Sequence, residues 1–253
     1  MATALEIIAH LDRELRVDSF TDYGPNGLQV PGPETVGVVV TGVSASLELF
    51  EAAAQLGADL LVTHHGLLWD AAPRRIDRAQ LERLRTLLDH DMALAAYHLP
   101  LDAHPELGNN ALLARGLGAK DHEPFAEHRG APIGRIARFP GDGLTLGELV
   151  GRVAELTERA PLVFDCGPPR VRRLGIVSGG GSTHLHEAAS LGLDAFLTGE
   201  PTEWVMATAR ESGVSFLAAG HYATETLGVR ALGALLAERF GVEHHFVDVP
   251  NPI

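Results

Sequence analysis

The chain has 253 residues, of which 45% are hydrophobic and 21% charged, a mixture typical of a globular protein with a sizeable core. With 20 basic and 33 acidic residues the formal net charge is -13, which disfavours nonspecific binding to a polyanionic nucleic acid. The one cysteine, Cys166, excludes an internal disulfide, and the sequence shows neither a signal-peptide pattern nor an apolar run of the roughly 18 residues that a membrane span needs. We therefore expect a cytoplasmic protein.

Hydrophobic patterns and glycine stops predict alternating helices and strands in the first half of the chain. The expected helices are 3–15, 46–57, 78–91 and 109–118, and the expected strands are 36–42, 59–63 and 92–98. This β-α-β-α order is typical of an α/β fold with a mainly parallel sheet.

The second half repeats the same rhythm. The expected strands are 173–179, 194–199 and 214–221, and the expected helices are 183–192 and about Thr224 to Arg239. The stretch 135–169 between the halves contains turn residues, one helix and short strands, and we interpret it as a connecting segment of the second half.

Two blocks of residues recur along the chain. Residues 51–69 match residues 186–204 at an offset of 135, and residues 95–102 match 218–225 at an offset of 123. The second match aligns His98 with His221 and Asp102 with Glu225. We interpret the repeat as an internal duplication, with a first lobe over 1–125 and a second over 126–253. The expected fold class is α/β, with two pseudo-symmetric lobes, each with a mainly parallel sheet and flanking helices, that face one cleft.

Histidines and carboxylates follow three of the predicted strands, at the end of a parallel sheet where ligands bind. His64 and His65 follow strand 59–63, His98 and Asp102 follow strand 92–97, and His221 and Glu225 follow strand 214–219. Because neighbouring side chains of a strand point to opposite faces, we expect the strand to end at Thr63, so that both adjacent histidines reach the cleft. Gly66 would help the backbone to leave regular geometry.

The spacing of each pair carries a further expectation. Glu225 lies four positions after His221, which places both on one face of a helix if a helix begins there. In the first copy Pro100 lies between the two residues, so we expect a loop to present Asp102. Imidazole and carboxylate together suit zinc, iron, manganese or cobalt, and two such ions activate water or clamp a phosphoryl group. A lone histidine at a strand end is more often structural, but the recurrence of the pair favours the metal interpretation.

Five motifs make the sequence similar to a known family. They are DYGPNGLQV (22–30), ADLLVTHHGLLW (58–69), YHLPLDAHPELGNNALLA (97–114), LDAFLTGE (193–200) and GHYATETLGVRAL (220–232). Together they resemble the Nif-three-like dinuclear-metal-centre hexameric proteins, whose members are often named GTP cyclohydrolase I type 2 homologues.

The resemblance implies two facing α/β lobes, two divalent ions per chain and a homohexamer. It places the metal ligands on His64, His65, Asp102, His221 and Glu225, with His98 as a neighbour or an occasional ligand, and it places DYGPNGLQV near the cleft. The usual proline after the histidine pair is Gly66 here.

Two functions remain open on this basis. The first is a metal-dependent hydrolase in which a metal-activated water attacks a small phosphorylated or nucleotide substrate, with no catalytic side chain assigned. The alternative is a non-catalytic metal-binding scaffold or a regulatory or metal-handling protein. Nucleic-acid binding through the central hole of a ring fits only if basic residues such as Arg74, Arg75 and Arg78 gather around the hole.

Other motifs have plainer interpretations. The loop SGGGST (178–183) either turns the chain or holds an anion with its backbone amides. Trp69 and Trp204 occupy matching places and are interpreted as packing residues, and Cys166 as an inert thiol.

Overall fold

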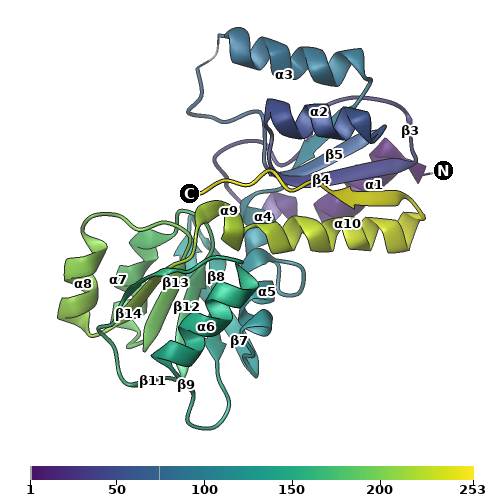
Figure 1. Ribbon diagram of the computed structural model, residues 1–253. Coiled ribbons are helices and arrows are strands. Elements are labelled where there is room, and N and C mark those ends of the chain that lie inside the picture. Colours follow the sequence, from purple (N-terminus) through teal and green to yellow (C-terminus); the bar gives the residue numbers. More distant parts are fainter. Residues whose placement is uncertain (1, 74) are drawn as a thin grey trace. The chain divides into compact units, whose positions relative to one another are not determined.

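The computed structural model describes residues 2–73 and 75–253, so Arg74 of the nucleic-acid alternative lies outside the described residues (Figure 1). Packing divides the chain into two compact units. Unit 1 comprises Met1–Leu101 and Gly228–Pro250, and unit 2 comprises Asp102–Leu227 and Asn251–Ile253. The boundary between residues 125 and 126, expected from the repeat, stays a prediction. The packing places Gly228–Pro250 in the same unit as the first part of the chain.

The main sheet of unit 1 has the strand order β15-β4-β5-β6-β2. Its strands are β2 (Gly27–Val30), β4 (Val38–Ser44), β5 (Leu60–His65), β6 (Ala93–Ala96) and β15 (Glu243–Phe246). All neighbouring pairs are parallel except β2 with β6. Strands β1 (Ala2–Thr3) and β3 (Thr35–Val36) form a separate, two-stranded antiparallel sheet. The expectation of a mainly parallel sheet is correct for this unit.

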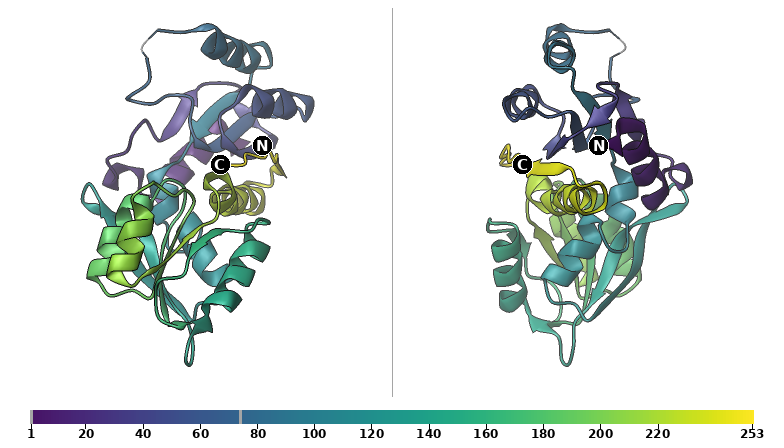
Figure 2. Two further views of the ribbon diagram at one scale, coloured as in Figure 1. Left: turned by 60° about the vertical axis from the view of Figure 1, so that its left-hand side comes forward. Right: turned by 90° about the vertical axis from the view of Figure 1, so that its right-hand side faces the viewer.

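Helices cover both faces of this sheet. The unit contains α1 (Ala4–Glu14), the short 3-10 helix η1 (Val17–Ser19), α2 (Leu47–Gln55), α3 (Arg78–Asp89) and most of α10 (Thr226–Phe240). Figure 1 shows α2 and α3 on one side of the sheet and α10 on the other, and the right-hand view of Figure 2 shows α2 and α3 end-on. On the α2 face, Gly42 leaves room for Leu49, and on the α10 face Thr41 bonds to His244, whose ring lies against Gly233.

Local chemistry explains where these helices start and stop. Thr3 and Glu6 form a capping box at the start of α1, and Ser46 caps the amide of Leu49 at the start of α2. After α2 the chain turns at Gly57, whose φ of 68° is cheap only for glycine. The predicted helices 3–15 and 46–57 are therefore confirmed with slightly shorter bounds.

The main sheet of unit 2 has the strand order β10-β14-β13-β12-β8-β7. Its strands are β7 (Asp121–His128), β8 (Ala131–Arg138), β10 (Leu162–Phe164), β12 (Arg173–Val177), β13 (Ala195–Thr198) and β14 (Ser215–Ala218). The three strands β12, β13 and β14 are parallel, but β7, β8 and β10 join them antiparallel. A mainly parallel second sheet is therefore a wrong expectation.

The segment 135–169 is also more than a connection. Strand β8 pairs directly with β12, and β10 forms the edge beside β14, so two pieces of this segment complete the second sheet. The alternating pattern of β7 and β8 gave no clear apolar run, because Arg135 is buried in β8 and hydrogen-bonds to the carbonyl of Ala103.

The helices of unit 2 also lie on two faces of their sheet. They are α5 (Asn109–Gly116), α6 (Leu146–Leu156), η2 (Ser182–His184), α7 (Leu185–Ser190), α8 (Val205–Ser212) and α9 (His221–Thr224), with the small pair β9 (Leu144–Thr145) and β11 (Arg170–Val171). One core cluster joins α5 and α6 to the strands through Leu113, Leu117, Leu149 and Val153. Figure 1 shows α7 and α8 on the opposite side. Helix α4 (Leu99–Ala103) contains the boundary between the units.

Residues at matching positions of the repeat have the same local structure. Oδ2 of Asp59 accepts the amides of Gly37 and Val38 at 2.7 and 2.9 Å. Oδ2 of Asp194 accepts the amides of Arg172 and Arg173 at 2.8 Å each. Each aspartate thus fixes the start of the neighbouring parallel strand in its own unit.

Among the described residues, no helix is both long enough and apolar enough to cross a membrane.

Candidate metal-binding sites

The candidate ligands lie where the parallel strands end. In unit 1, β5 ends at His65 and β6 ends two residues before His98. In unit 2, β12 and β14 end shortly before Ser178 and His221. Because parallel strands end on the same edge of a sheet, each unit gathers its polar residues on one edge.

The adjacent histidines belong to a strand that does not end at Thr63. Strand β5 continues to His65, which still pairs with Ser44, so the expected strand end is wrong. The rings nevertheless lie together, with centroids 4.8 Å apart at an angle of 46°. Since β6 ends at Ala96, which pairs with Thr63, His64 and His65 have no strand beside them on the β6 side, and both imidazoles can reach beyond the end of that strand. His64 is fully buried, whereas His65 is partly exposed.

His64, His65 and His98 form the candidate ligand set of unit 1. One ring nitrogen from each lies within 4.8 Å of one from each of the others. Nδ1 of His64 is 3.0 Å from the carbonyl oxygen of Tyr97, which can only accept, so this nitrogen carries the proton. The lone pair of neutral His64 is consequently on Nε2, the nitrogen through which an imidazole held in this way binds metal.

Asp22 holds His98 in the same manner. Nδ1 of His98 donates to Oδ1 of Asp22 at 2.7 Å, and the His98 amide donates to Oδ1 of Asn26 at 2.8 Å. Burial raises the pKa of Asp22, but the hydrogen bonds from His98, Asn26 and the Tyr23 amide, with the charge of His98, outweigh burial and lower the pKa to about 2. The DYGPN stretch therefore provides an ionised carboxylate that orients His98, a role that the sequence did not reveal.

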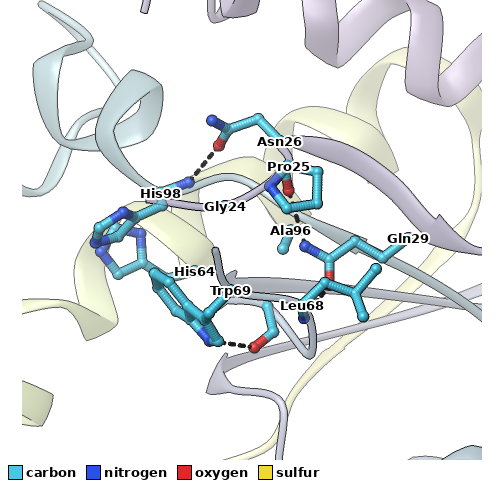
Figure 3. Close-up of a pocket in the computed structure, with 10 residues that line it drawn as sticks. Gly24, Pro25, Asn26, Gln29, His64, Leu68, Trp69, Ala96 and His98 are labelled. Atoms are coloured by element: carbon cyan, nitrogen blue, oxygen red, sulfur yellow. Dashed lines mark hydrogen bonds between the residues drawn. The ribbon is translucent and has the colours of Figure 1, made fainter. Parts of the chain in front are cut away.

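The loop after the histidine pair is fixed from the same motif. Oε1 of Gln29 accepts the amides of Leu67 and Leu68 at 2.8 and 3.1 Å. The Trp69 indole donates to the carbonyl of Gly66 at 2.9 Å, and its ring meets that of His98 at a centroid distance of 5.2 Å. Figure 3 shows Trp69, His64 and His98 beside one another in a small pocket. Trp69 is thus more than a core residue, since it forms a wall of the histidine cluster.

In unit 2 the candidate ligands are His221, Glu225 and Asp102. His221 is the first residue of α9, and its Nε2 is 3.3 Å from Oε2 of the buried Glu225. The predicted helix is interrupted at this point, because Glu225 lies between α9 and α10 with a φ of -116°. The expected i,i+4 approach of the two side chains is nevertheless present.

A second carboxylate contacts the other nitrogen of His221. Nδ1 of His221 donates to Oε1 of Glu200. Burial lowers the pKa of His221, but the hydrogen bonds and charges of Glu225 and Glu200 outweigh it and raise the pKa to about 9. Glu200 was missed from the sequence, although the offset of 135 aligns it with His65.

Asp102 comes from a helix and not from a loop. Helix α4 contains both Pro100 and Asp102, because proline in a first helical turn removes no intrahelical hydrogen bond. Oδ1 of Asp102 accepts from Nδ2 of Asn109 at 2.8 Å and from the hydroxyl of Ser178 at 2.9 Å. A carboxylate oxygen of Asp102 lies within 4.8 Å of one of Glu225, which is close enough for both to bind one ion.

The glycine-rich loop 178–183 packs against these ligands. Three of its amides already donate to protein oxygens: Ser178 to Asn110, Gly179 to Thr224 and Gly181 to Thr198, at 2.7 to 3.0 Å. These amides are committed to holding the loop, which favours the turn interpretation over an anion site. Gly179, with a φ of 60°, approaches His221 and Glu225 closely.

This mixed α/β protein has imidazoles and carboxylates clustered where its parallel strands end, which makes it a candidate metal-binding protein. The family model of Duf34/NIF3 (NGG1p interacting factor 3) matches residues 2–252. The chain therefore belongs to the Duf34/NIF3 family, which confirms the resemblance found in the sequence motifs.

Individual relatives are similar over their full length. A Pseudomonas aeruginosa protein named GTP cyclohydrolase 1 type 2 homolog is 42% identical over 253 residues, covering 100% of both chains. An Escherichia coli protein of the same name is 44% identical over 246 residues, covering 96% of both. Among solved structures, protein ybgI has a TM-score of 0.93 at 42% identity, covering 99% of this chain and 100% of that one. TTHA1606 from Thermus thermophilus has a TM-score of 0.91 at 39% identity, with coverage of 99% and 100%.

Proposed function

We propose that this protein binds two divalent metal ions through His64, His65, Asp102, His221 and Glu225 and acts as a metal-dependent hydrolase. The observation that carries the proposal is the orientation of the imidazoles. The proton on Nδ1 of His64 is fixed by the carbonyl of Tyr97, and that of His221 is directed at Glu200, so Nε2 is the ligand nitrogen in each case.

The donor sets of the two units complement each other chemically. Unit 1 supplies imidazoles from His64 and His65, which are neutral ligands, and unit 2 supplies one imidazole and the carboxylates of Asp102 and Glu225. Two dications need carboxylates to offset their charge, and the proposed ligands of unit 1 are imidazoles only, so the carboxylates must come from unit 2. We therefore propose that the two units act as lobes facing one cleft. Zinc, iron, manganese and cobalt all suit these ligands.

Divalent ions in such a site supply Lewis acidity and lower the pKa of water enough to make it a nucleophile near neutral pH. The residues of the chain set the conditions for this chemistry. Asn109 and Ser178 orient Asp102, and the partly exposed His65 and His98 keep one side of the histidine cluster accessible to a small molecule. An accessible site favours a hydrolase, because a purely structural metal site is closed.

The proposed substrate is a small phosphorylated compound or a nucleotide. The relatives named GTP cyclohydrolase 1 type 2 homolog support a nucleotide. The sequence contains no residue set that singles out guanine, so we propose small phosphorylated compounds or nucleotides as the substrate class, and not GTP in particular. As further parts of this proposal, the protein is a homohexamer and works in the cytoplasm.

The test is anaerobic purification followed by elemental analysis and a screen of nucleotides and phosphoesters with each of the four metals restored. We expect about two ions per chain and metal-dependent hydrolysis of at least one compound class. Bound metal without any turnover would contradict the hydrolase and leave the non-catalytic scaffold or metal-handling role. Folded protein that binds no added metal would contradict both.

A further inference from the structure

Two histidines at matching positions of the repeat have the same hydrogen-bond arrangement. The offset of 123 aligns His98 with His221, and each follows the last of the consecutive parallel strands in its unit. Each donates from Nδ1 to a carboxylate, His98 to Asp22 and His221 to Glu200. The two carboxylates, however, do not match each other in the sequence repeat.

Asp22 is built into its place by several donors. Its side chain is only 3% exposed. Oδ1 accepts from the Tyr23 amide and from His98, both at 2.7 Å, and Oδ2 accepts from the Leu99 amide and from Nδ2 of Asn26, both at 2.9 Å. Since both oxygens are held by backbone amides, the carboxylate cannot rotate away, and it fixes the ring that it contacts.

Glu200 reaches the equivalent position from a different strand. It follows β13 by two residues, and the offset of 135 places it where unit 1 has His65. At this position of the repeat, unit 1 therefore has a candidate ligand, His65, and unit 2 has a carboxylate that orients a ligand, Glu200. This difference explains why unit 1 needs Asp22, from outside its parallel strands, to hold His98.

We propose that Asp22 and Glu200 are positioning residues that fix the tautomer and the ring direction of two histidines for metal binding: His221 of the proposed ligand set, and His98, which this inference adds to that set. This inference rests on the proposed metal centre. The physical reason is that a carboxylate on Nδ1 keeps the proton there, leaves the lone pair on Nε2 and makes that nitrogen a stronger donor. The structure also assigns His98 a place beside His64 and His65, with ring centroids 5.0 and 5.6 Å away.

The experiment compares Asp22→Ala and Glu200→Ala with Asp59→Ala and Asp194→Ala. The two controls remove carboxylates that hold backbone amides in the same units but contact no histidine in the hydrogen bonds described above. Cobalt(II) is titrated into each metal-free protein against a competing chelator, and the visible absorption spectrum of the cobalt-loaded protein is recorded. Circular dichroism reports folding.

We expect each positioning variant to lose about 10- to 100-fold in cobalt affinity, with an altered visible spectrum, while both controls bind as the wild type does. A loss of less than about tenfold in folded Glu200→Ala overturns the inference for Glu200, and the same result in folded Asp22→Ala overturns it for Asp22. Glu200 is 39% exposed, so its variant keeps the inference testable if Asp22→Ala does not fold. An equal loss in the controls also overturns it.

The same data separate this inference from the proposed function. If the wild type binds no cobalt, the metal centre itself is refuted. If the wild type binds cobalt and the positioning variants bind equally well, only the role of Asp22 and Glu200 is refuted. Since the readout is affinity and spectrum, absence of hydrolysis has no effect on the result.

Discussion

Gly179 and Glu225 are in such close contact that a side chain on Gly179 would overlap Oε1 of Glu225. The added Cβ would also lie 2.9 Å from Nε2 of His221. The loop 178–183 thus needs glycine here for space as well as for its φ of 60°.

The first prediction concerns Gly179→Ala. We expect it to displace Glu225 and to lower bound metal, measured per chain by elemental analysis. The matched control is Gly192→Ala, which has a φ of 61° but no atom within 4 Å of the added Cβ. Both variants should lose about 1–2 kcal/mol of unfolding free energy from backbone strain. Equal metal content in the two would show that Gly179 has no specific role at the ligands.

The second prediction concerns the charge at the proposed centre. Glu225→Ala removes a buried carboxylate that offsets the two cations, and we expect it to reduce bound metal more than His98→Ala does. Cys166→Ala should leave metal content unchanged. Elemental analysis of the three variants, with circular dichroism to exclude misfolding, is the measurement. Two ions per chain in folded Glu225→Ala would argue against the dinuclear centre.

A third prediction tests the glycine-rich loop as an anion site. The hydroxyl of Ser182 donates to the carbonyl of Glu200, and neighbouring amides are already bonded to protein oxygens. Ser182→Ala should therefore leave the affinity for a phosphorylated ligand unchanged, while unfolding free energy falls by about 1 kcal/mol. Calorimetric titration with inorganic phosphate and a nucleotide checks this, and weaker binding of both would restore the anion interpretation.

The fourth prediction concerns assembly. A homohexamer should give a mass by light scattering of about six times the 26.9 kDa of one chain. Measurements at several concentrations separate a stable ring from weak association. A monomer at micromolar concentration would contradict the proposed assembly.

The sequence predicted the central strands β4, β5 and β6 of unit 1, because they are mostly apolar runs, but it missed the edge strands β2 and β15, the latter with the sequence EHHF. It predicted unit 2 less well, because β7 and β8 carry charged residues: Arg138 pairs with Glu123 across the two strands, and Arg135 donates to the carbonyl of Ala103 in α4. Periodicity cannot identify such strands, since their polar residues are satisfied by tertiary partners.

The candidate site was predicted as a set of ligands, but its supporting residues were not. The pairs His98–Asp102 and His221–Glu225 could be proposed from the sequence because they follow apolar strands in both halves, whereas the adjacent histidines His64 and His65 occur in the first half only. Asp22 and Asn26 could not, because they lie 76 and 72 residues before His98 in the sequence and only the fold brings them into contact with it. The convergence of His64 and His65 also depends on the missing neighbour beyond Ala96, which no local pattern encodes.

The place of β15 has a consequence for how the protein is made. This strand comes near the end of the sequence, yet it covers the open edge of β4 in the first sheet. While a ribosome is still producing unit 2, β4 would have unpaired amides and carbonyls along that edge, which is the kind of surface that recruits other unfinished chains. We therefore expect nascent chains that stop after Glu225 and before Glu243 to aggregate or to occupy chaperones, even though the candidate ligand residues have all been synthesised.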